Sequence, residues 1–437
     1  MYLKDSLLEK ISNNNEVVGV IGLGYVGLPL AVNFAEAGIN VIGFDKNQEK
    51  VDKINNGDNY IKDIRDAVLR EVVIDKITLT ATTDFTLIEE CDALLICVPT
   101  PLDKFRKPDM HYIEDACIEI GKNMKPGTFI SLESTTYPTT TEEFMLPIIE
   151  KESGLEHGTD FWLAYSPERV DPGNQNFHTK NTPKVIGAMT DEGLEIGIKL
   201  YSMAIDTLHP VSSPRVAEMV KILENTYRLI NISLINELAL LAGKMDINIW
   251  EVIEAAKTKP FGFQAFYPGP GIGGHCIPLD PFYLEHIAKK YDFDLSMIHA
   301  AGHINMRMPH YMYIKIATAL NTHKKSVNGS KILFLGVAYK PNIDDARESP
   351  ALEIMHITSK KGGIVTYHDP FIPEVRMHYD TMLSSVALTP DLLREADVVV
   401  LTTNHSVFDV SFIQQNANLI VDLRNMILEK NENINKL

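Results

Sequence analysis

Short apolar runs, separated by polar and glycine-rich stretches, set the pattern of the first half of the chain. Their length and continuous apolar character are typical of strands buried in a parallel sheet. The runs are residues 17–21, 41–44, 93–98 and 128–132. Between the first two runs, residues 28–37 have the apolar spacing of a helix. The alternation predicts a doubly wound α/β domain over residues 1–200.

A long stretch with helical periodicity follows. Apolar residues recur every three or four positions from residue 214 to residue 244, at Val216, Met219, Val220, Leu223, Tyr227, Ile230, Leu234, Leu238 and Leu241. About 30 residues is long for a helix of a globular protein. Such a helix can join two domains and form a dimer interface, or it can be buried within one subunit. We expect residues 201–320 to be a helical linker and dimerisation segment.

A second α/β pattern begins near residue 331. Apolar runs at residues 332–337, 364–367, 398–401 and 419–421 predict further buried strands, with a helix over residues 349–359. We therefore expect a second Rossmann-like domain over residues 321–437. The predicted fold is α/β, with two Rossmann-like doubly wound domains joined by a helical segment that contains a long central helix.

Composition narrows the classes of function. The chain has 437 residues, of which 45% are hydrophobic and 23% charged, and its formal net charge is −17. This charge argues against broad binding of nucleic acid or anionic membranes. No apolar run reaches transmembrane length, and residues 1–15 contain no signal-peptide core, so a cytoplasmic protein is expected. The four cysteines lack zinc-site spacing, so no metal is expected.

A glycine turn follows the first predicted strand and precedes the first helix. It reads Gly22-Leu23-Gly24-Tyr25-Val26-Gly27, with Asp45 about 20 residues later. The first two glycines allow a tight turn and close approach to a pyrophosphate, while the third allows the helix to pack on the strand. Asp45 would accept hydrogen bonds from the ribose hydroxyls and repel a 2′-phosphate. The motif predicts NAD rather than NADP; the alternative is a tight turn without a cofactor.

Two loops follow predicted strands of the same domain. Val98, Pro99 and Thr100 begin one loop, and Ser134 and Thr135 begin the other. The carboxyl ends of parallel strands line nucleotide crevices, so both loops are candidates for the cofactor site. Proline and threonine are also common in ordinary turns, and their spacing leaves this alternative open.

The most unusual segment is the glycine-rich turn over residues 269–274, which ends close to Cys276. Asp280 follows four residues later, on the same face if a helix begins directly after the turn. A thiol on such a turn is placed to attack a substrate, whereas the alternative is an inert buried cysteine. Lys221 and Asn225 share a face of the long helix and could stabilise an oxyanion. A solvated helix surface is their alternative, and Glu168 has the same ambiguity.

Cations are also placed at the carboxyl edge of the second α/β unit. Lys340 and Arg347 follow its first strand, and Arg424 follows its last predicted strand. Three cations at one edge suit a diphosphate. The alternative is surface salt bridging with neighbouring acidic residues.

Together these motifs resemble the UDP-glucose/GDP-mannose dehydrogenase family, and the resemblance runs nearly end to end. The matching segments occur in the expected order, at residues 22–27, 98–101, 133–135, 166–168, 221–225, 273–276 and 339–349. One departure lies after Thr135. Many relatives have a Pro-Gly turn there, whereas this chain has Tyr137-Pro138-Thr139-Thr140.

The resemblance implies roles for the candidate residues. Cys276 would be the nucleophile of a C6 oxidation that passes through a thiohemiacetal and a thioester. Lys221 and Asn225 would stabilise oxyanions, Asp280 would help to activate water or thiol, and Glu168 would act as a general base with Thr135. The implied NAD-binding residues are Gly22, Gly24, Tyr25, Val26, Gly27, Asp45, Val98, Pro99, Thr100, Thr135 and Arg347. The implied substrate-binding residues are Glu168, Arg169, Lys221, Asn225, Phe266, Tyr267, Gly273, Tyr339, Lys340 and Arg424.

The segment around the thiol is most similar to the UDP-N-acetylglucosamine branch of the family, which implies UDP-N-acetylglucosamine as substrate and surface polysaccharide synthesis as context. Leu279 stands where UDP-glucose enzymes often have a basic residue. UDP-N-acetylgalactosamine, UDP-N-acetylmannosamine and UDP-glucose are the alternatives. The family also implies a homodimer or a higher oligomer. Two other hypotheses are a two-electron hydroxy-acid dehydrogenase and a nucleotide-binding sensor.

Overall fold

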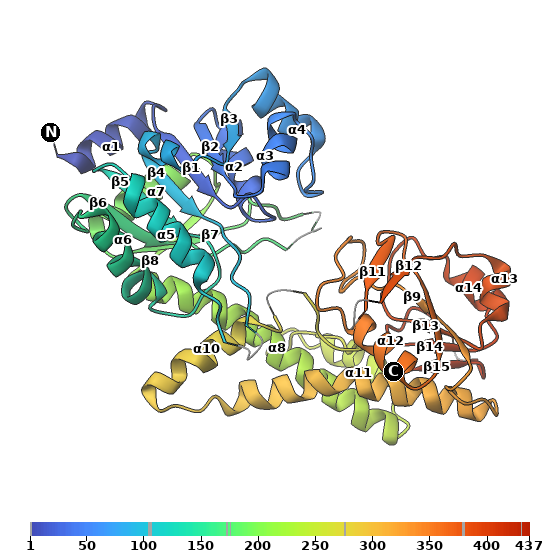
Figure 1. Ribbon diagram of the computed structural model, residues 1–437. Coiled ribbons are helices and arrows are strands. Elements are labelled where there is room, and N and C mark those ends of the chain that lie inside the picture. Colours follow the sequence, from blue (N-terminus) through green and yellow to red (C-terminus); the bar gives the residue numbers. More distant parts are fainter. Residues whose placement is uncertain are drawn as a thin grey trace. The chain divides into compact units, whose positions relative to one another are not determined.

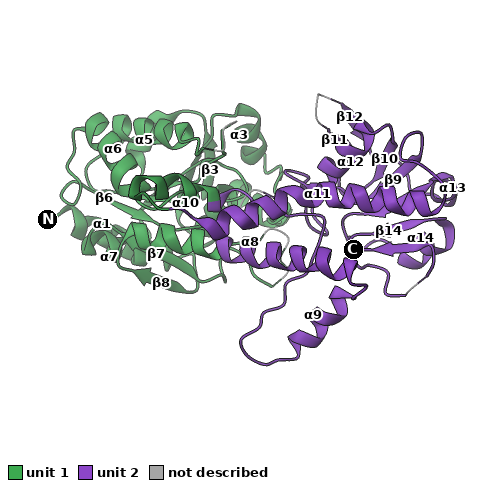
Figure 2. Cartoon of the chain, turned by 90° about the horizontal axis from the view of Figure 1, so that it is seen from below, with its two compact units in different colours: residues 1–224, 282–293 green, residues 225–281, 294–437 purple. Residues whose placement is uncertain are grey.

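The computed structural model describes residues 2–103, 107–171, 174, 176–274, 277–377, 381–429 and 431–437. These residues form two compact units, which are coloured separately in Figure 2. Unit 1 contains Met1–Glu224 and Phe282–Phe293, and unit 2 contains Asn225–Pro281 and Asp294–Leu437. Each unit has its own sheet, with an apolar core on each face of that sheet.

The sheet of unit 1 has the strand order β3-β2-β1-β4-β5-β6-β7-β8. Its strands are β1 (Val17–Ile21), β2 (Asn40–Phe44), β3 (Leu79–Thr82), β4 (Ala93–Ile96), β5 (Thr128–Leu132), β6 (Phe161–Tyr165), β7 (Lys184–Ala188) and β8 (Leu208–Val211). All neighbouring pairs are parallel except β6 and β7. The first six strands have the order of a dinucleotide-binding sheet, whose order reverses between β1 and β4.

Helices cover both faces of this sheet (Figure 1). They are α1 (Leu3–Ser12), α2 (Gly27–Glu36), α3 (Gln48–Asn55), α4 (Asp66–Arg70), α5 (His111–Asn123), α6 (Leu146–Ser153) and α7 (Asp191–Tyr201). Short helical turns occur at η1 (Glu71–Asp75), η2 (Phe85–Glu90), η3 (Thr140–Met145) and η4 (Lys289–Tyr291). Successive side chains of a strand alternate between two cores: Leu95 belongs to the core with α2 and α7, and Leu94 to the core with α5 and α6.

Unit 2 contains a five-stranded parallel sheet with the order β10-β9-β13-β14-β15. Its strands are β9 (Lys331–Leu335), β10 (Ile364–His368), β13 (Val398–Leu401), β14 (Ile420–Asp422) and β15 (Ile434–Lys436). An antiparallel pair, β11 (Glu374–Arg376) and β12 (Met382–Ser384), lies outside this sheet. The order is that of a flavodoxin-like doubly wound sheet, which reverses between β9 and β13.

The helices of unit 2 also cover two faces. The helices are α9 (Ile249–Lys257), α11 (Ser296–Thr322), α12 (Pro350–Lys360), α13 (Pro390–Glu395) and α14 (Val410–Asn416). Ile316 and Ile354 bring α11 and α12 into the core of one face, whereas Leu393 and Ile413 bring α13 and α14 into the core of the other (Figure 1). Burying each such side chain stabilises the fold by about 1.5–3 kcal/mol.

Two helices cross the division between the units. Helix α8 (Pro214–Lys244) has the bounds that its periodicity predicts, and the division falls between Glu224 and Asn225. Helix α10 (Asp280–Ala288) crosses the second division. The predicted fold class, two Rossmann-like sheets linked by a long helix, is confirmed.

Among the described residues, no helix combines the length and the apolar character that a membrane span requires. The cytoplasmic location stays a prediction.

Candidate active site

The glycine turn after β1 has the backbone geometry that a bound dinucleotide requires. Gly22 has a φ of 93°, and a Cβ there would lie 2.7 Å from the carbonyl oxygen of Cys97. A Cβ on Gly27 would lie 1.9 Å from the carbonyl oxygen of Gly22, so this glycine permits α2 to pack against the turn. At Gly24 a Cβ would meet no atom within 4 Å. The turn therefore leaves space for a pyrophosphate beside the amino end of α2.

Asp45 is held at the end of β2 and faces this turn. Its Oδ2 accepts a hydrogen bond from the Leu23 backbone N–H at 3.0 Å and pairs with Lys50 at 3.2 Å. Its Oδ1 accepts from the Asn47 backbone N–H at 2.9 Å. Oδ2 therefore accepts two bonds, whereas Oδ1 accepts one, so these contacts fix the side chain and leave a lone pair of Oδ1 for a ribose hydroxyl.

The loops after β4 and β5 are joined at the carboxyl edge of the sheet. Ser134 Oγ donates to the Val98 carbonyl oxygen at 2.6 Å. The Tyr283 hydroxyl, from the α10 segment of unit 1, donates to the Thr100 carbonyl oxygen. The two loops predicted from strand ends therefore lie side by side. Thr135 follows Ser134 directly at this edge.

A buried ion pair lies beneath these loops. Lys184 Nζ is 2.6 Å from Glu133 Oε2, and the Tyr201 hydroxyl donates to the other carboxylate oxygen. Burial opposes the positive charge on Lys184, but the carboxylates of Glu133 and Glu168 together raise its pKa. The sequence motif includes Glu133, but Lys184 and Tyr201 were not predicted.

Lys221 and Glu168 meet in unit 1. Lys221 Nζ donates to the backbone carbonyl oxygen of Glu168 at 2.6 Å, and the lysine is only 9% exposed. The Glu168 carboxylate accepts from the backbone N–H groups of Arg169 and Val170 at 2.7 and 2.8 Å. The Arg169 guanidinium forms an ion pair with Glu224 at 2.6 Å. Burial of Lys221 excludes the alternative of a solvated helix surface.

Asn225, one helical turn after Lys221, contacts Asp280 within unit 2. Its Nδ2 donates to Asp280 Oδ2 at 2.5 Å, and both side chains are buried. Helix α10 begins only at Asp280, and residues 277–279 form a turn, so the condition under which Cys276 and Asp280 would share a helix face is not met. Cys276 and its neighbour His275 lie outside the described residues.

The glycine turn before Cys276 is held by two asparagines. The Gly269 N–H donates to Asn236 Oδ1 at 2.9 Å, and the Ile272 N–H donates to Asn305 Oδ1 at 2.6 Å. Neither asparagine was predicted as a site residue. Asn236, on α8, is fully buried.

The same turn packs against the loop that follows β9. The Gly274 N–H donates to the Arg347 carbonyl oxygen at 3.2 Å. A Cβ on Gly273 would lie 2.8 Å from the Cβ of Tyr339, and one on Gly274 would lie 2.9 Å from the Tyr339 ring. The structure therefore brings together Gly273 and Tyr339, as predicted for one site, and Lys340 follows in the same loop.

Arg424 reaches this turn from the end of β14. A Cβ on Gly269 would lie 2.5 Å from an Arg424 guanidinium nitrogen, so a larger residue there would displace the guanidinium. Arg424 Nε donates to the Thr402 carbonyl oxygen at 2.9 Å, and burial lowers its pKa to about 10. Arg347 is more exposed and pairs with Asp345 at 2.5 Å, the salt bridge that the sequence left open. Its cofactor role stays a prediction.

The two predicted aromatic residues pack within unit 2. The Phe266 ring lies edge-on to Tyr227 of α8, with 5.8 Å between the ring centroids. The Tyr267 ring stacks on Trp250 of α9, and its hydroxyl donates to Glu254 at 2.7 Å.

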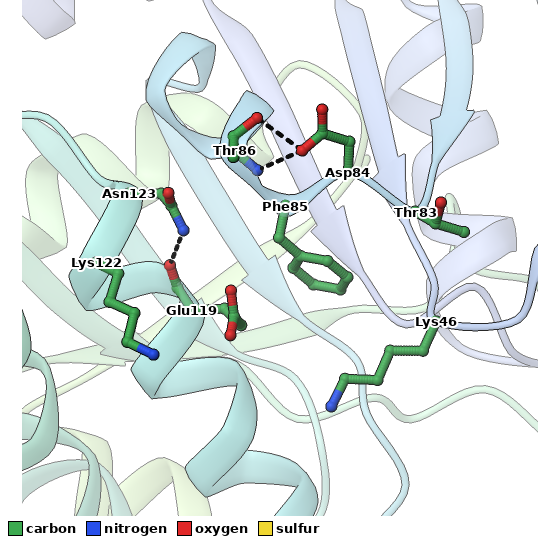
Figure 3. Close-up of a pocket in the computed structure, with 8 residues that line it drawn as sticks. All are labelled: Lys46, Thr83, Asp84, Phe85, Thr86, Glu119, Lys122 and Asn123. Carbon is green, nitrogen blue, oxygen red and sulfur yellow. Dashed lines mark hydrogen bonds between the residues drawn. The ribbon is translucent and has the colours of Figure 1, made fainter.

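A separate pocket of about 520 Å³ lies on the surface of unit 1 (Figure 3). Its lining residues are Lys46, Thr83, Asp84, Phe85, Thr86, Glu119, Lys122 and Asn123. None of them is a predicted site residue. Lys46 is paired with Asp115 at 2.7 Å, and the lining mixes both signs of charge.

Among the described residues, no group of three or more His, Cys, Asp or Glu side chains could hold a metal ion.

Comparison with protein families finds three consecutive matches, all described as domains of the UDP-glucose/GDP-mannose dehydrogenase family. The NAD binding domain matches residues 16–205, the central domain residues 215–307, and the UDP binding domain residues 333–429.

Individual relatives match over most of their length. The chain is 35% identical to UDP-N-acetyl-D-glucosamine 6-dehydrogenase of Pseudomonas aeruginosa, over 90% of this chain and 91% of the relative. It is 37% identical to UDP-N-acetyl-D-mannosamine dehydrogenase of Campylobacter jejuni, over 91% and 97%. The solved structure of a UDP-D-ManNAc dehydrogenase from Pyrococcus horikoshii matches with a TM-score of 0.87 and 33% identity, over 96% and 98%.

Proposed function

Because this chain belongs to the UDP-glucose/GDP-mannose dehydrogenase family, and is therefore an NAD-dependent dehydrogenase of UDP-sugars, we propose that it oxidises UDP-N-acetylglucosamine at C6 to UDP-N-acetylglucosaminuronate. One observation carries the proposed chemistry. Lys221 and Asn225 are buried one turn apart on α8; Lys221 donates to the backbone carbonyl oxygen of Glu168, and Asn225 donates to the Asp280 carboxylate. A buried cation and a buried amide one turn apart on a helix suit oxyanion stabilisation, and the carboxylates of Asp280 and Glu168 suit proton transfer.

The proposed reaction removes four electrons from one carbon. Bound NAD supplies the hydride acceptor, so the two oxidations reduce two NAD molecules and release two protons. After the first oxidation, the Cys276 sulfur bonds to the aldehyde carbon and forms a thiohemiacetal. Loss of the second hydride and a proton gives a thioester. The oxygen of a water molecule then replaces the sulfur, which releases the carboxylate and a third proton and regenerates the thiol.

The other residues stabilise and position this chemistry. The Lys221 ammonium and the Asn225 amide stabilise the negative oxygen that forms when sulfur or water adds to the carbon. Glu168 removes a proton from the hydrolytic water, which Thr135 orders. Asp280 fixes the Asn225 amide through their hydrogen bond and assists proton transfer at water or thiol.

Separate segments bind the two nucleotides in this proposal. Gly24 and Asp45 receive NAD in residues 1–200, while Lys340 and Arg424 bind the UDP diphosphate in residues 321–437. The open space at Gly24 and the burial of Arg424 beside Gly269 support these assignments. Residues 201–320 form the third domain, which carries Cys276.

UDP-N-acetylmannosamine is the second candidate substrate, because the Campylobacter jejuni and Pyrococcus horikoshii relatives are named for mannosamine. A panel of UDP-N-acetylglucosamine, UDP-N-acetylmannosamine, UDP-N-acetylgalactosamine and UDP-glucose separates the candidates by kcat/KM for NADH formation. We expect UDP-N-acetylglucosamine to exceed each of the others by at least about tenfold. A higher value for another sugar would assign that sugar instead.

We also propose that the protein forms a homodimer through α8. The helix exposes a stripe of apolar side chains at Val216, Met219, Leu223, Tyr227, Leu234, Leu238 and Leu241. Their three- and four-residue spacing puts them along one side of the helix. A second copy of this chain would bury this stripe and stabilise the dimer.

A further inference from the structure

A buried carboxylate on α8 lies less than one turn before Lys221. Glu218 is fully buried, and its two oxygens receive three hydrogen bonds from one short segment. Oε2 accepts from the Thr139 N–H at 2.6 Å. Oε1 accepts from the N–H and the hydroxyl of Thr141 at 3.0 and 2.8 Å. The bonds join α8 to a segment 77–79 residues away in the sequence.

The segment that contains Thr139 and Thr141 begins, four residues earlier, with Thr135. On one side of Thr135, Ser134 is tied to the Val98 carbonyl oxygen at 2.6 Å. On the other side, the Thr136 hydroxyl lies 2.7 Å from the Thr140 hydroxyl, between the two threonines that bond to Glu218. Thr135 is therefore fixed from both directions.

The backbone held by Glu218 is strained. Thr139 has a φ of 85°, which costs a β-branched residue about 1–3 kcal/mol. A strained conformation persists where surrounding contacts determine it, and the bonds to Glu218 are such contacts.

We propose that Glu218 is a positioning residue, which holds the Thr135 segment in a fixed place relative to Lys221 during the reaction. The inference rests on the roles proposed above for Thr135 and Lys221. Glu218 touches neither nucleotide in this account. It acts through the backbone of Thr139 and Thr141 on one side, and through the helix that carries Lys221 on the other.

The ionised form of Glu218 suits this role. An ionised carboxylate accepts all three bonds, whereas a protonated one places an O–H donor where an acceptor is needed. Burial raises the pKa of Glu218 to about 7, although its bonds to Thr141 and Thr139 oppose the rise. The nearby carboxylate of Glu142 also raises this pKa. Tyr137 and Glu143 are further titratable residues of the surrounding segment, and Lys290 also acts on Tyr137.

Glu218→Gln tests the inference because it keeps the size of the side chain and removes its charge. At pH 8 we expect kcat to fall about tenfold, while KM for NAD and for the UDP-sugar stays within about twofold. Wild-type kcat should rise with pH through about 7 as Glu218 ionises, and this step should be absent from the variant. Thr141→Val, which removes one of the three donors, should lower kcat by a smaller factor, and it provides the test if Glu218→Gln does not fold.

Glu142→Gln is the matched control. It removes a carboxylate from the same segment, one that pairs with Arg215, and should keep the wild-type kcat. Wild-type kcat and an unchanged pH step in folded Glu218→Gln would overturn the inference, as would a lower melting temperature with normal kcat. In those cases the proposed reaction itself would stand. Absence of NADH formation by the wild-type protein with every UDP-sugar would overturn both.

Discussion

Single glycines determine how closely the segment before Cys276 approaches the rest of unit 2. Gly274 has a φ of 86°, and a Cβ there would lie 2.9–3.1 Å from three atoms of the Tyr339 ring. Gly274→Ala should therefore displace either the turn or Tyr339. We expect a loss of about 1–3 kcal/mol in stability from the backbone alone and a fall in kcat/KM of at least about tenfold.

Gly243→Ala is the control for this change. Gly243 lies in α8, and a Cβ there would meet no atom within 4 Å. Alanine should stabilise the helix by about 0.5–1 kcal/mol and leave kcat/KM unchanged. Equal kinetics in Gly274→Ala and Gly243→Ala would contradict the claim that Gly274 is required for close approach.

The ion pair beneath the cofactor loops gives a second prediction. Lys184→Met leaves the Glu133 carboxylate buried without its cation. The free energy of unfolding should therefore fall by about 3–5 kcal/mol, and the melting temperature should fall with it. The double variant Glu133→Gln/Lys184→Met should recover much of this loss, since no unpaired charge remains. Calorimetry of both variants measures the difference. A double variant that melts below Lys184→Met would contradict this account.

Some of these residues could be predicted from sequence and others could not. Lys221 and Asn225 were identifiable because four-residue spacing places side chains on one helix face whatever the tertiary fold. Glu218 and Lys184 were not, because their importance depends on partners about 80 and 50 residues away. The signals available in the sequence were a glutamate between two apolar residues of the helical pattern and a lysine that begins an apolar strand.

At the scale of elements, continuous apolar runs were the reliable signal. They located β1, β5 and β13 at their observed bounds, because strands buried on both faces leave little freedom in composition. Helix α11 was missed because its apolar residues are interrupted by polar residues and by Pro309, which usually marks a helix end. The antiparallel β7 was also not predicted, since pairing direction depends on the connection rather than on the strand.

Helix α8 shows what a periodic pattern leaves open. Its predicted apolar stripe is largely exposed, while polar Glu218, Asn225 and Asn236 are buried. Periodicity predicts that a helix has an apolar side, but it does not predict which part of the protein covers that side. The exposed stripe is therefore the basis for the proposed dimer.

Charge placed within this stripe tests the dimer. Leu234→Glu/Leu238→Glu should shift the sedimenting species from about twice 49.0 kDa to 49.0 kDa at micromolar concentration, because two carboxylates would be desolvated at the interface. Ile74→Glu in unit 1, where the isoleucine is 47% exposed, introduces a similar charge outside the stripe and should leave the mass unchanged. A wild-type chain that sediments as a monomer would contradict the proposal.

At the scale of the whole molecule, the chain uses one architectural rule twice. Each doubly wound sheet has a loop at the point where its strand order reverses, after β1 in unit 1 and after β9 in unit 2. The first loop offers glycines and the second offers Tyr339 and Lys340. The division between the units falls between Glu224 and Asn225, so α8 contributes Lys221 to one unit and Asn225 to the other.

The number of NADH molecules formed per sugar consumed tests the central claim most directly. The purified protein would be incubated with limiting UDP-N-acetylglucosamine and excess NAD, with the product identified by mass. A double oxidation through Cys276 predicts two NADH per sugar and a carboxylate product. One NADH per sugar, with an aldehyde or ketone as product, would contradict the thioester mechanism and leave a two-electron dehydrogenase.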